Sequence, residues 1–205
     1  AAIMMEVVQG EGGVIPLTQE FVKGAAQLAA EQDLLLICDE VQIGNGRSGK
    51  LYGYMHYGIT PDIVSTAKGL GGGLPGATLL GEKVQDVLTP GSHGSTFGGN
   101  PVCCAGALSI LHRLDGPLLQ SVQEKSDFIV KALTGAKGVR SVTGLGLMLG
   151  VETERPVKDV ISECMARGVL VISAKNKVRL LPALNIPMAQ LEQAIGVLKD
   201  VCAGE

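Results

Sequence analysis

Two ionisable residues each follow a short apolar run, at positions where strands are expected to end. Asp39 follows the run at 34–38, and Lys68 follows the run at 63–67. In parallel sheets ligands bind beyond the carboxyl ends of the strands, so both side chains are candidates for a site. A partly desolvated lysine loses its proton more readily and attacks carbonyl carbons, while a nearby carboxylate can keep a ring nitrogen protonated. Alternatively, Asp39 and Lys68 are ordinary loop residues exposed to solvent. These two residues alone do not decide between a binding site and exposed loops.

Four sequence motifs, in order along the chain, give further evidence about the role of Asp39 and Lys68. They are EVVQGEGG at 6–13, CDEVQIGNGRSG at 38–49, PDIVSTAKGLGGG at 61–73 and HGSTFGGNP at 93–101. Each resembles a string of the class III aminotransferases with the spacing kept, although Val7 stands where that family usually has proline. A Schiff-base lysine with an acidic partner for the pyridinium nitrogen is the arrangement of pyridoxal phosphate enzymes. The resemblance covers essentially the whole chain, but only the second half of the family's length.

The resemblance implies a role for each residue that matches the cofactor site. Lys68 would carry pyridoxal 5'-phosphate as a Schiff base and shuttle a proton between the substrate carbon and the cofactor. Asp39 would pair with the pyridinium nitrogen and keep the ring an electron sink. Val41 would pack on one ring face, and Gln42 would hydrogen-bond near the phenolic oxygen.

Further matches imply contacts to the substrate and between subunits. Thr96, with Ser95, would reach the cofactor phosphate of the neighbouring subunit, which implies a homodimer. Arg179 resembles the family's carboxylate-binding arginine, because its planar fork suits a substrate carboxylate; an exposed strand charge is the alternative. Glu11 would lie near the substrate and could hold Arg179 aside when an amino donor without a carboxylate there must enter.

The implied activity is a ping-pong transamination of an ω-amino group, with 2-oxoglutarate as the acceptor. The strings at 10–13 and 69–75 look most like those of acetylornithine aminotransferases, which act in arginine biosynthesis. Ornithine, succinylornithine and 4-aminobutyrate aminotransferases are the near alternatives. The family's phosphate-cup glycine loop and its stacking aromatic residue do not occur in this sequence. A catalytically silent fragment is therefore a second hypothesis.

The expected architecture is α/β, as in fold-type I aminotransferases truncated at the N-terminus. We expect the second part of a mainly parallel-sheet cofactor domain at 1–115, a connecting helix at 116–134 and a smaller α+β domain at 135–205. The chain begins like the interior of a strand, so we expect residues upstream of it. The expected strands are 2–8, 34–38 (buried on both faces), 63–67, 77–80, a pair within 139–151, 169–173 and 178–181, and the expected helices are 18–32, 100–114, 118–133, 157–167 and 188–202.

Composition excludes several classes of protein. A formal charge of −3 gives no electrostatic footprint for nucleic acid, and a 46% hydrophobic content excludes intrinsic disorder. No apolar run approaches the roughly 20 residues of a membrane helix. Five cysteines without a Cys-x-x-Cys pair predict reduced, buried residues in a cytoplasmic protein.

Competing motifs are weaker. The G-x-G-x-x-G string at 44–49 does not lead into a helix, so dinucleotide binding is not expected. The glycines at 71–73 lack the Gly-Lys-Ser/Thr of a phosphate-binding loop. The three histidines at 56, 93 and 112 are too scattered for a metal site. Asp39 and Glu40 are adjacent strand residues on opposite faces, so they do not form a glycosidase pair.

Overall fold

The computed structural model describes residues 1–73 and 76–205. It forms two compact units, the first made of 1–7, 17–45 and 50–115 and the second of 8–16, 46–49 and 116–205. The Leu74–Pro75 end of the glycine-rich string lies outside the described residues. The domain boundaries expected from the sequence stay a prediction.

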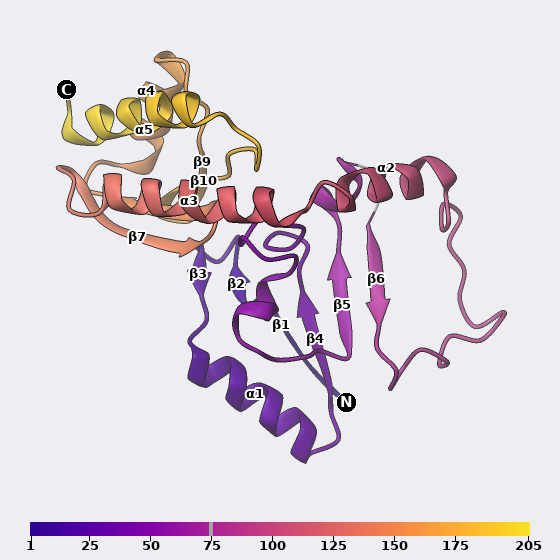
Figure 1. Cartoon of the computed structure of the whole chain (residues 1–205). Helices are drawn as coiled ribbons and strands as arrows, with labels where there is room; N and C mark the ends of the chain where they lie inside the picture. The colour runs from indigo at the N-terminus through magenta and orange to yellow at the C-terminus, as the bar shows by residue number, and fades with distance from the viewer. Residues whose placement is uncertain (74–75) are drawn as a thin grey trace. The chain divides into compact units, whose positions relative to one another are not determined.

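The first unit contains a four-stranded sheet in the order β1-β4-β5-β6 (Figure 1). Strands β1 (Ala2–Met5), β4 (Leu35–Asp39) and β5 (Ile63–Thr66) run parallel to one another. Strand β6 (Ala77–Leu80) is antiparallel to β5. The sheet is therefore mostly parallel, as the sequence predicted.

Helix α1 (Gln19–Glu31) connects two of the parallel strands and packs against both β1 and β4. It begins where the sequence predicted, because the Thr18 hydroxyl accepts a hydrogen bond from the Phe21 amide at 3.2 Å. Val22 and Ala29 form its buried face. Phe21 belongs to the apolar pattern of the helix but is 58% exposed.

Strand β4 is buried on one face only, contrary to the expectation of burial on both. Leu36 and Cys38 are buried, whereas Leu35, Ile37 and Asp39 are half-buried. Alternate side chains of a strand point to opposite faces, so one face of the sheet is covered and the other stays partly open. The apolar run alone could not distinguish the two cases.

Two short 3-10 helices and one longer helix complete the first unit. They are η1 (Gly53–His56), η2 (Lys68–Gly71) and α2 (Pro101–Leu111). Asn100 caps α2 by accepting hydrogen bonds from the amides of the second and third helical residues at 3.0 and 3.2 Å. Helix α2 packs against η2 and so lies close to Lys68.

The second unit is built on an antiparallel sheet in the order β7-β8-β10-β9. Its strands are β7 (Val139–Leu145), β8 (Met148–Thr153), β9 (Ile172–Ala174) and β10 (Lys177–Leu180), and its helices are α3 (Gly116–Leu133), α4 (Val157–Ala166) and α5 (Met188–Ala203). A small hairpin, β2 (Val8–Gln9) and β3 (Ile15–Pro16), also belongs to this unit.

The core of the second unit lies between its sheet and its helices. Val151 and Val178 of the sheet meet Leu198 of α5 and Ile129 of α3 in one apolar cluster. Each such fully buried side chain contributes about 1.5–3 kcal/mol to folding. Among the described residues no single helix is long and apolar enough to cross a membrane, and α2 and α3 reach that length and composition only when taken together.

The five cysteines are free thiols. Cys38, Cys164 and Cys202 are buried, as expected. Cys103 and Cys104 are not: one is half-buried and the other exposed, because no side chain of α2 reaches full burial. Burial raises the pKa of the Cys38 thiol to about 12 and that of Cys202 to about 11, so both stay protonated at neutral pH.

Candidate active site

The structure brings Asp39 and Lys68 to the same edge of the parallel sheet in the first unit. Asp39 is the last residue of β4 and pairs in register with Ser65 of β5. Lys68 opens η2, two residues after β5 ends at Thr66. Because β4 and β5 are neighbouring parallel strands, their carboxyl ends coincide and offer a carboxylate and an amine at one crevice. Asp39 is half-buried and Lys68 is exposed.

Asp39 organises the chain that follows it. Its Oδ1 accepts a hydrogen bond from the Val41 amide at 2.9 Å, which is an Asx turn. This bond ends the strand and begins the run of turns through 41–48. Val41 and Gln42 are half-buried at the start of that run.

Glu40 lies on the opposite face and has a role that the sequence did not suggest. Its side chain is completely buried, and its two carboxylate oxygens accept hydrogen bonds from the Gly53 and Tyr54 amides at 2.7 and 2.8 Å. Burial raises the pKa of this carboxyl to about 7, although the two amide bonds oppose the shift. Glu40 therefore ties the end of β4 to η1, 13 residues later.

Lys68 occupies a strained backbone conformation. Its φ is +46°, in the left-handed region that residues other than glycine rarely adopt. The carbonyl of Ala67 accepts a hydrogen bond from Leu70 at 3.0 Å, and that of Lys68 accepts one from Gly73 at 3.1 Å. Such strain persists only where the surroundings enforce it, and it concentrates at functional sites.

In the second unit the structure pairs Arg179 with Glu11. Arg179 is a buried residue of β10, and its Nη1 donates a hydrogen bond to Glu11 Oε1 at 2.7 Å. Glu11 belongs to the turn at 10–13 between β2 and β3. The two residues are 168 positions apart, so the pairing is a product of tertiary structure. They belong to a different compact unit from Asp39 and Lys68.

The turn that carries Glu11 is fixed on the sheet through Val14. Val14 is completely buried and has a φ of +54°, a rare conformation for a β-branched residue. The Thr143 hydroxyl donates to its carbonyl at 2.8 Å and accepts a bond from Lys177 Nζ at 2.8 Å. Val14 lies directly over Gly150, where any β-carbon would come within 2.9 Å of the valine side chain.

Residues 46–49 of the G-x-G-x-x-G segment belong to the second unit, where Arg47 bridges two backbone carbonyls. Arg47 donates through Nη1 to the carbonyls of Leu147 and Pro182 at 3.2 and 2.5 Å. Burial lowers the pKa of this guanidinium to about 10. A β-carbon on Gly146 would lie 2.4 Å from the Arg47 carbonyl oxygen, so the segment needs a glycine opposite it. Turns and a short 3-10 helix follow the segment, unlike the helix of a dinucleotide-binding motif.

Ser95 and Thr96 lie in a loop that precedes the cap of α2, and both are exposed. Phe97, the next residue, is 73% exposed. The contact of Ser95 and Thr96 with a neighbouring subunit stays a prediction.

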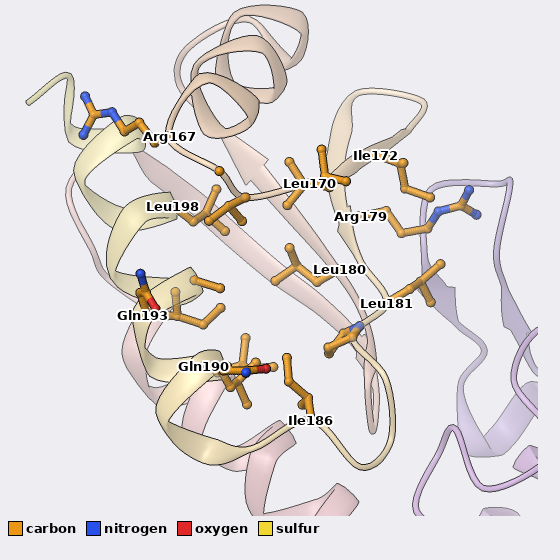
Figure 2. A pocket seen from close by; sticks show the side chains of 18 residues that line it. Arg167, Leu170, Ile172, Arg179, Leu180, Leu181, Ile186, Gln190, Gln193 and Leu198 are labelled. Carbon is orange, nitrogen blue, oxygen red and sulfur yellow. The ribbon is translucent and has the colours of Figure 1, made fainter.

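A cavity of about 470 Å³ lies beside Arg179 in the second unit (Figure 2). Its lining is largely apolar. Leu180 lies near the middle and Leu198 on the side formed by α5, while the guanidinium of Arg179 points away from both (Figure 2). Arg167 also borders it and is bound to Glu163 at 2.5 Å. Among the described residues that line it there is no carboxylate, histidine or thiol, so these residues offer no group for acid–base or nucleophilic chemistry. In the described part of the chain no three His, Cys, Asp or Glu residues are grouped to hold a metal ion.

Relatives of known name match nearly the whole chain. The acetylornithine aminotransferase of Haemophilus ducreyi is 48% identical over 203 residues, which are 98% of this chain and 52% of that protein. That of Aquifex aeolicus is 43% identical over 98% of this chain and 54% of its own length. The chain therefore spans about half the length of the relatives it matches.

Solved structures agree with this comparison. The ornithine aminotransferase of Toxoplasma gondii matches with a TM-score of 0.94 and 31% identity, over 100% of this chain and 51% of that one. The N-acetylornithine aminotransferase of Stenotrophomonas maltophilia gives a TM-score of 0.90 and 32% identity, over 100% of this chain and 56% of that one. These neighbours confirm the expected α/β fold of fold-type I aminotransferases. The family model for class-III aminotransferases matches residues 1–202, and the chain belongs to that family.

Proposed function

We propose that the protein to which this chain belongs transfers an ω-amino group, with N-acetylornithine as the donor and 2-oxoglutarate as the acceptor, in arginine biosynthesis. The observation that carries the proposal is the position of Asp39 and Lys68 at the ends of neighbouring parallel strands. Acetylornithine aminotransferases among the relatives support the choice of donor. Ornithine, succinylornithine and 4-aminobutyrate remain the alternative donors.

The residues at the sheet edge fit the cofactor of the family. Class-III aminotransferases are pyridoxal phosphate enzymes, and the cofactor supplies an electron sink that makes a C–H bond of the substrate acidic. Lys68 offers an exposed amine, and Asp39 offers a carboxylate for the ring nitrogen. Ser65 pairs in register with Asp39, and its hydroxyl oxygen is buried without a hydrogen-bond partner in the described part of the chain. The unsatisfied Ser65 hydroxyl, next to Asp39 on the neighbouring strand, suits a polar ligand at this edge of the sheet.

Each side chain at this edge has a distinct proposed task. Lys68 holds the cofactor through its amine and, once released by the substrate, moves the proton at the substrate carbon. Asp39 keeps the ring nitrogen protonated. Val41 packs against one face of the ring, and Gln42 hydrogen-bonds near its phenolic oxygen. The Asx turn of Asp39 supports this arrangement, since it sets the direction in which Val41 and Gln42 leave the strand.

Arg179 and Glu11 are proposed to select the substrate in the two half-reactions. N-acetylornithine presents an amino group at the reacting end, whereas 2-oxoglutarate presents a carboxylate next to its reacting carbon. Arg179 binds that carboxylate with its planar fork. When the amino donor enters, Glu11 occupies the same arginine, as in the ion pair of this structure.

The protein is proposed to act as a cytoplasmic homodimer. Thr96, with Ser95, reaches the cofactor phosphate of the neighbouring subunit. The exposure of both hydroxyl side chains supports this role.

The 205-residue chain by itself is proposed to bind the cofactor weakly and to turn over no substrate. The half-length match to the relatives favours this second hypothesis. It concerns the isolated chain and leaves the proposed reaction of the whole protein unchanged.

Covalent trapping tests the proposed site directly. The chain is incubated with pyridoxal phosphate, borohydride reduces the carbon–nitrogen bond to a stable secondary amine, and mass spectrometry locates the modified lysine. We expect preferential modification of Lys68 over Lys23 and Lys131, which are also exposed. Equal modification of the three lysines would overturn the assignment of Lys68.

A further inference from the structure

The backbone at Lys68 is held by a residue from a different part of the first unit. Asn45 donates hydrogen bonds from its side-chain nitrogen to Thr66 Oγ1 at 2.9 Å and to the Ala67 carbonyl at 3.1 Å. The two acceptors belong to the two residues before Lys68. Asn45 and Thr66 are only 4% and 2% exposed, so these bonds form out of water.

The bond to Ala67 acts on the peptide that defines φ at Lys68. The Ala67 carbonyl and the Lys68 amide share one planar peptide group. Fixing the carbonyl from two sides, by Asn45 at 3.1 Å and by the Leu70 amide at 3.0 Å, fixes that plane. The left-handed φ of +46° at Lys68 is measured from this plane. The two bonds therefore oppose relaxation of the lysine towards an ordinary conformation.

Asn45 is itself suited to the place. Its φ is +55°, which asparagine tolerates better than most residues with a side chain. A β-carbon on Gly69 would meet the Asn45 β-carbon at 3.4 Å, so the chain after Lys68 passes close to this side chain. Asn45 Oδ1 is buried without a hydrogen-bond partner in the described part of the chain. If the Asn45 side-chain amide were flipped, its Oδ1 would face the Ala67 carbonyl oxygen, and two acceptors would meet without a hydrogen between them.

We propose that Asn45 is a positioning residue for Lys68. It sets the backbone from which the lysine side chain reaches the cofactor, and this inference rests on the proposed function of Lys68. Asn45 touches neither substrate nor cofactor in this role. It acts through the Ala67–Lys68 peptide.

Two variants remove the bonds and keep the backbone conformation of residue 45. Asn45→Asp has nearly the same shape but, when ionised, donates no hydrogen bond. Asn45→Gly adopts a positive φ without strain and introduces no charge. A matched control is Val22→Ala, which removes a completely buried side chain from α1 and lowers stability at a distance from Lys68 in the sequence.

Hydrogen exchange of the Leu70 amide is the first measurement, because this amide donates to the carbonyl that Asn45 holds. Each variant is measured at the same number of degrees below its own melting temperature. Under these conditions we expect the Leu70 amide to exchange about tenfold faster in both Asn45 variants than in Val22→Ala. Exchange equal to that of the control would overturn the proposal. This readout needs no cofactor, so it decides the positioning role even if the proposed function is wrong.

Borohydride trapping with pyridoxal phosphate is the second measurement. The yield at Lys68 is divided by the yield at Lys23 in the same sample. In the unaltered chain a ratio near one would reject the proposed function. Where that ratio is well above one, we expect it to fall about tenfold in Asn45→Asp and Asn45→Gly and to stay unchanged in Val22→Ala. An unchanged ratio in the Asn45 variants would overturn the positioning role.

Discussion

Arg179 and Glu11 form an ion pair whose two ends are very differently exposed. The Arg179 Nη1 to Glu11 Oε1 distance is 2.7 Å, and the arginine side chain is 10% exposed against 74% for the glutamate. An exposed carboxylate gains little from such a pair, because water solvates it nearly as well. The arginine is held by its strand, whereas the glutamate stands on a turn. This difference supports the proposal that a substrate carboxylate replaces Glu11 without moving Arg179.

Substitution of Glu11 tests this exchange in an active preparation. Glu11→Gln keeps the shape but removes the competing charge, so 2-oxoglutarate should bind Arg179 more readily. We expect its KM to fall about three- to tenfold, which corresponds to roughly 0.7–1.4 kcal/mol. The KM of the amino donor should rise, because Arg179 is no longer neutralised when the donor enters. Steady-state kinetics with each substrate varied in turn checks both, and equal shifts in the same direction would contradict the exchange.

We expect substitutions of Lys68 and Asp39 to have separable effects on cofactor binding and on activity. In an active preparation, Lys68→Ala should remove the cofactor absorbance band near the visible edge together with transamination. Asp39→Ala should retain some cofactor but lose most activity, because the ring nitrogen is no longer held protonated. Absorbance spectra and turnover of the two variants, side by side with the unaltered protein, measure this. A Lys68→Ala protein that keeps both band and turnover would refute the central assignment.

The single strand expected over 2–8 is wrong, because the structure has β1 (Ala2–Met5) and β2 (Val8–Gln9) there, and β3, η1 and η2 were not predicted. The sequence did predict the longer elements and the position of Asp39 and Lys68. Both follow from local patterns: an apolar run predicts a strand, and a polar residue at its end lies at a known edge of a parallel sheet. Contacts made by Glu40, Asn45 and Arg47 could not be predicted in this way. They join segments up to 135 residues apart, through loops whose path depends on tertiary packing.

The burial of β4 on one face only could not be predicted either, because it depends on tertiary packing. Five consecutive residues, Leu34 to Cys38, are apolar, which fits burial on either one face or two. Which face is covered depends on the elements that pack there. The exposure of Cys104 likewise depends on the packing of α2, which its apolar composition does not reveal.

Glu40 should make stability depend on pH. Its pKa is about 7 in the folded chain against an ordinary value of 4.5. The folded state therefore holds this proton more tightly than the unfolded state. The stabilisation is complete below about pH 4.5 and is lost as pH rises through about 7. A difference of about 2.5 pKa units corresponds to on the order of 3 kcal/mol.

Glu40→Gln isolates this contribution. The amide does not ionise, so the decline in melting temperature between pH 5 and 7 should be shallower than in the unaltered chain. The NH₂ group of the glutamine would face the backbone N–H of Gly53 or Tyr54, and two donors cannot form a hydrogen bond. The variant should therefore be less stable than the unaltered chain at pH 5. Thermal unfolding across this pH range measures both effects. Parallel pH profiles for the two proteins would rule out a raised pKa at Glu40.

Arg47 should contribute to stability through its hydrogen bonds to the backbone carbonyls of Leu147 and Pro182. Arg47→Lys keeps a charge but replaces the planar fork with a single ammonium on a different stem. We expect a loss of about 1.5–3 kcal/mol, because hydrogen bonds from a half-buried charged group are broken or strained. Arg113→Lys is the control, since Arg113 is exposed and should change stability by less than about 0.5 kcal/mol. Urea denaturation with equal midpoints for both variants would contradict this role of Arg47.

The isolated 205-residue chain provides the last prediction. Its described residues include Lys68, the proposed partner of the ring nitrogen and the proposed carboxylate-binding arginine, but the matched relatives are about twice as long. Binding energy for the cofactor phosphate and for the second ring face is expected to come from residues outside this sequence. We therefore expect glutamate formation from N-acetylornithine and 2-oxoglutarate at least about a thousandfold slower than in a full-length relative, a loss of about 4 kcal/mol in barrier stabilisation. A coupled glutamate assay on chain of confirmed mass measures it, and turnover close to that of the relative would show that these 205 residues contain a complete site.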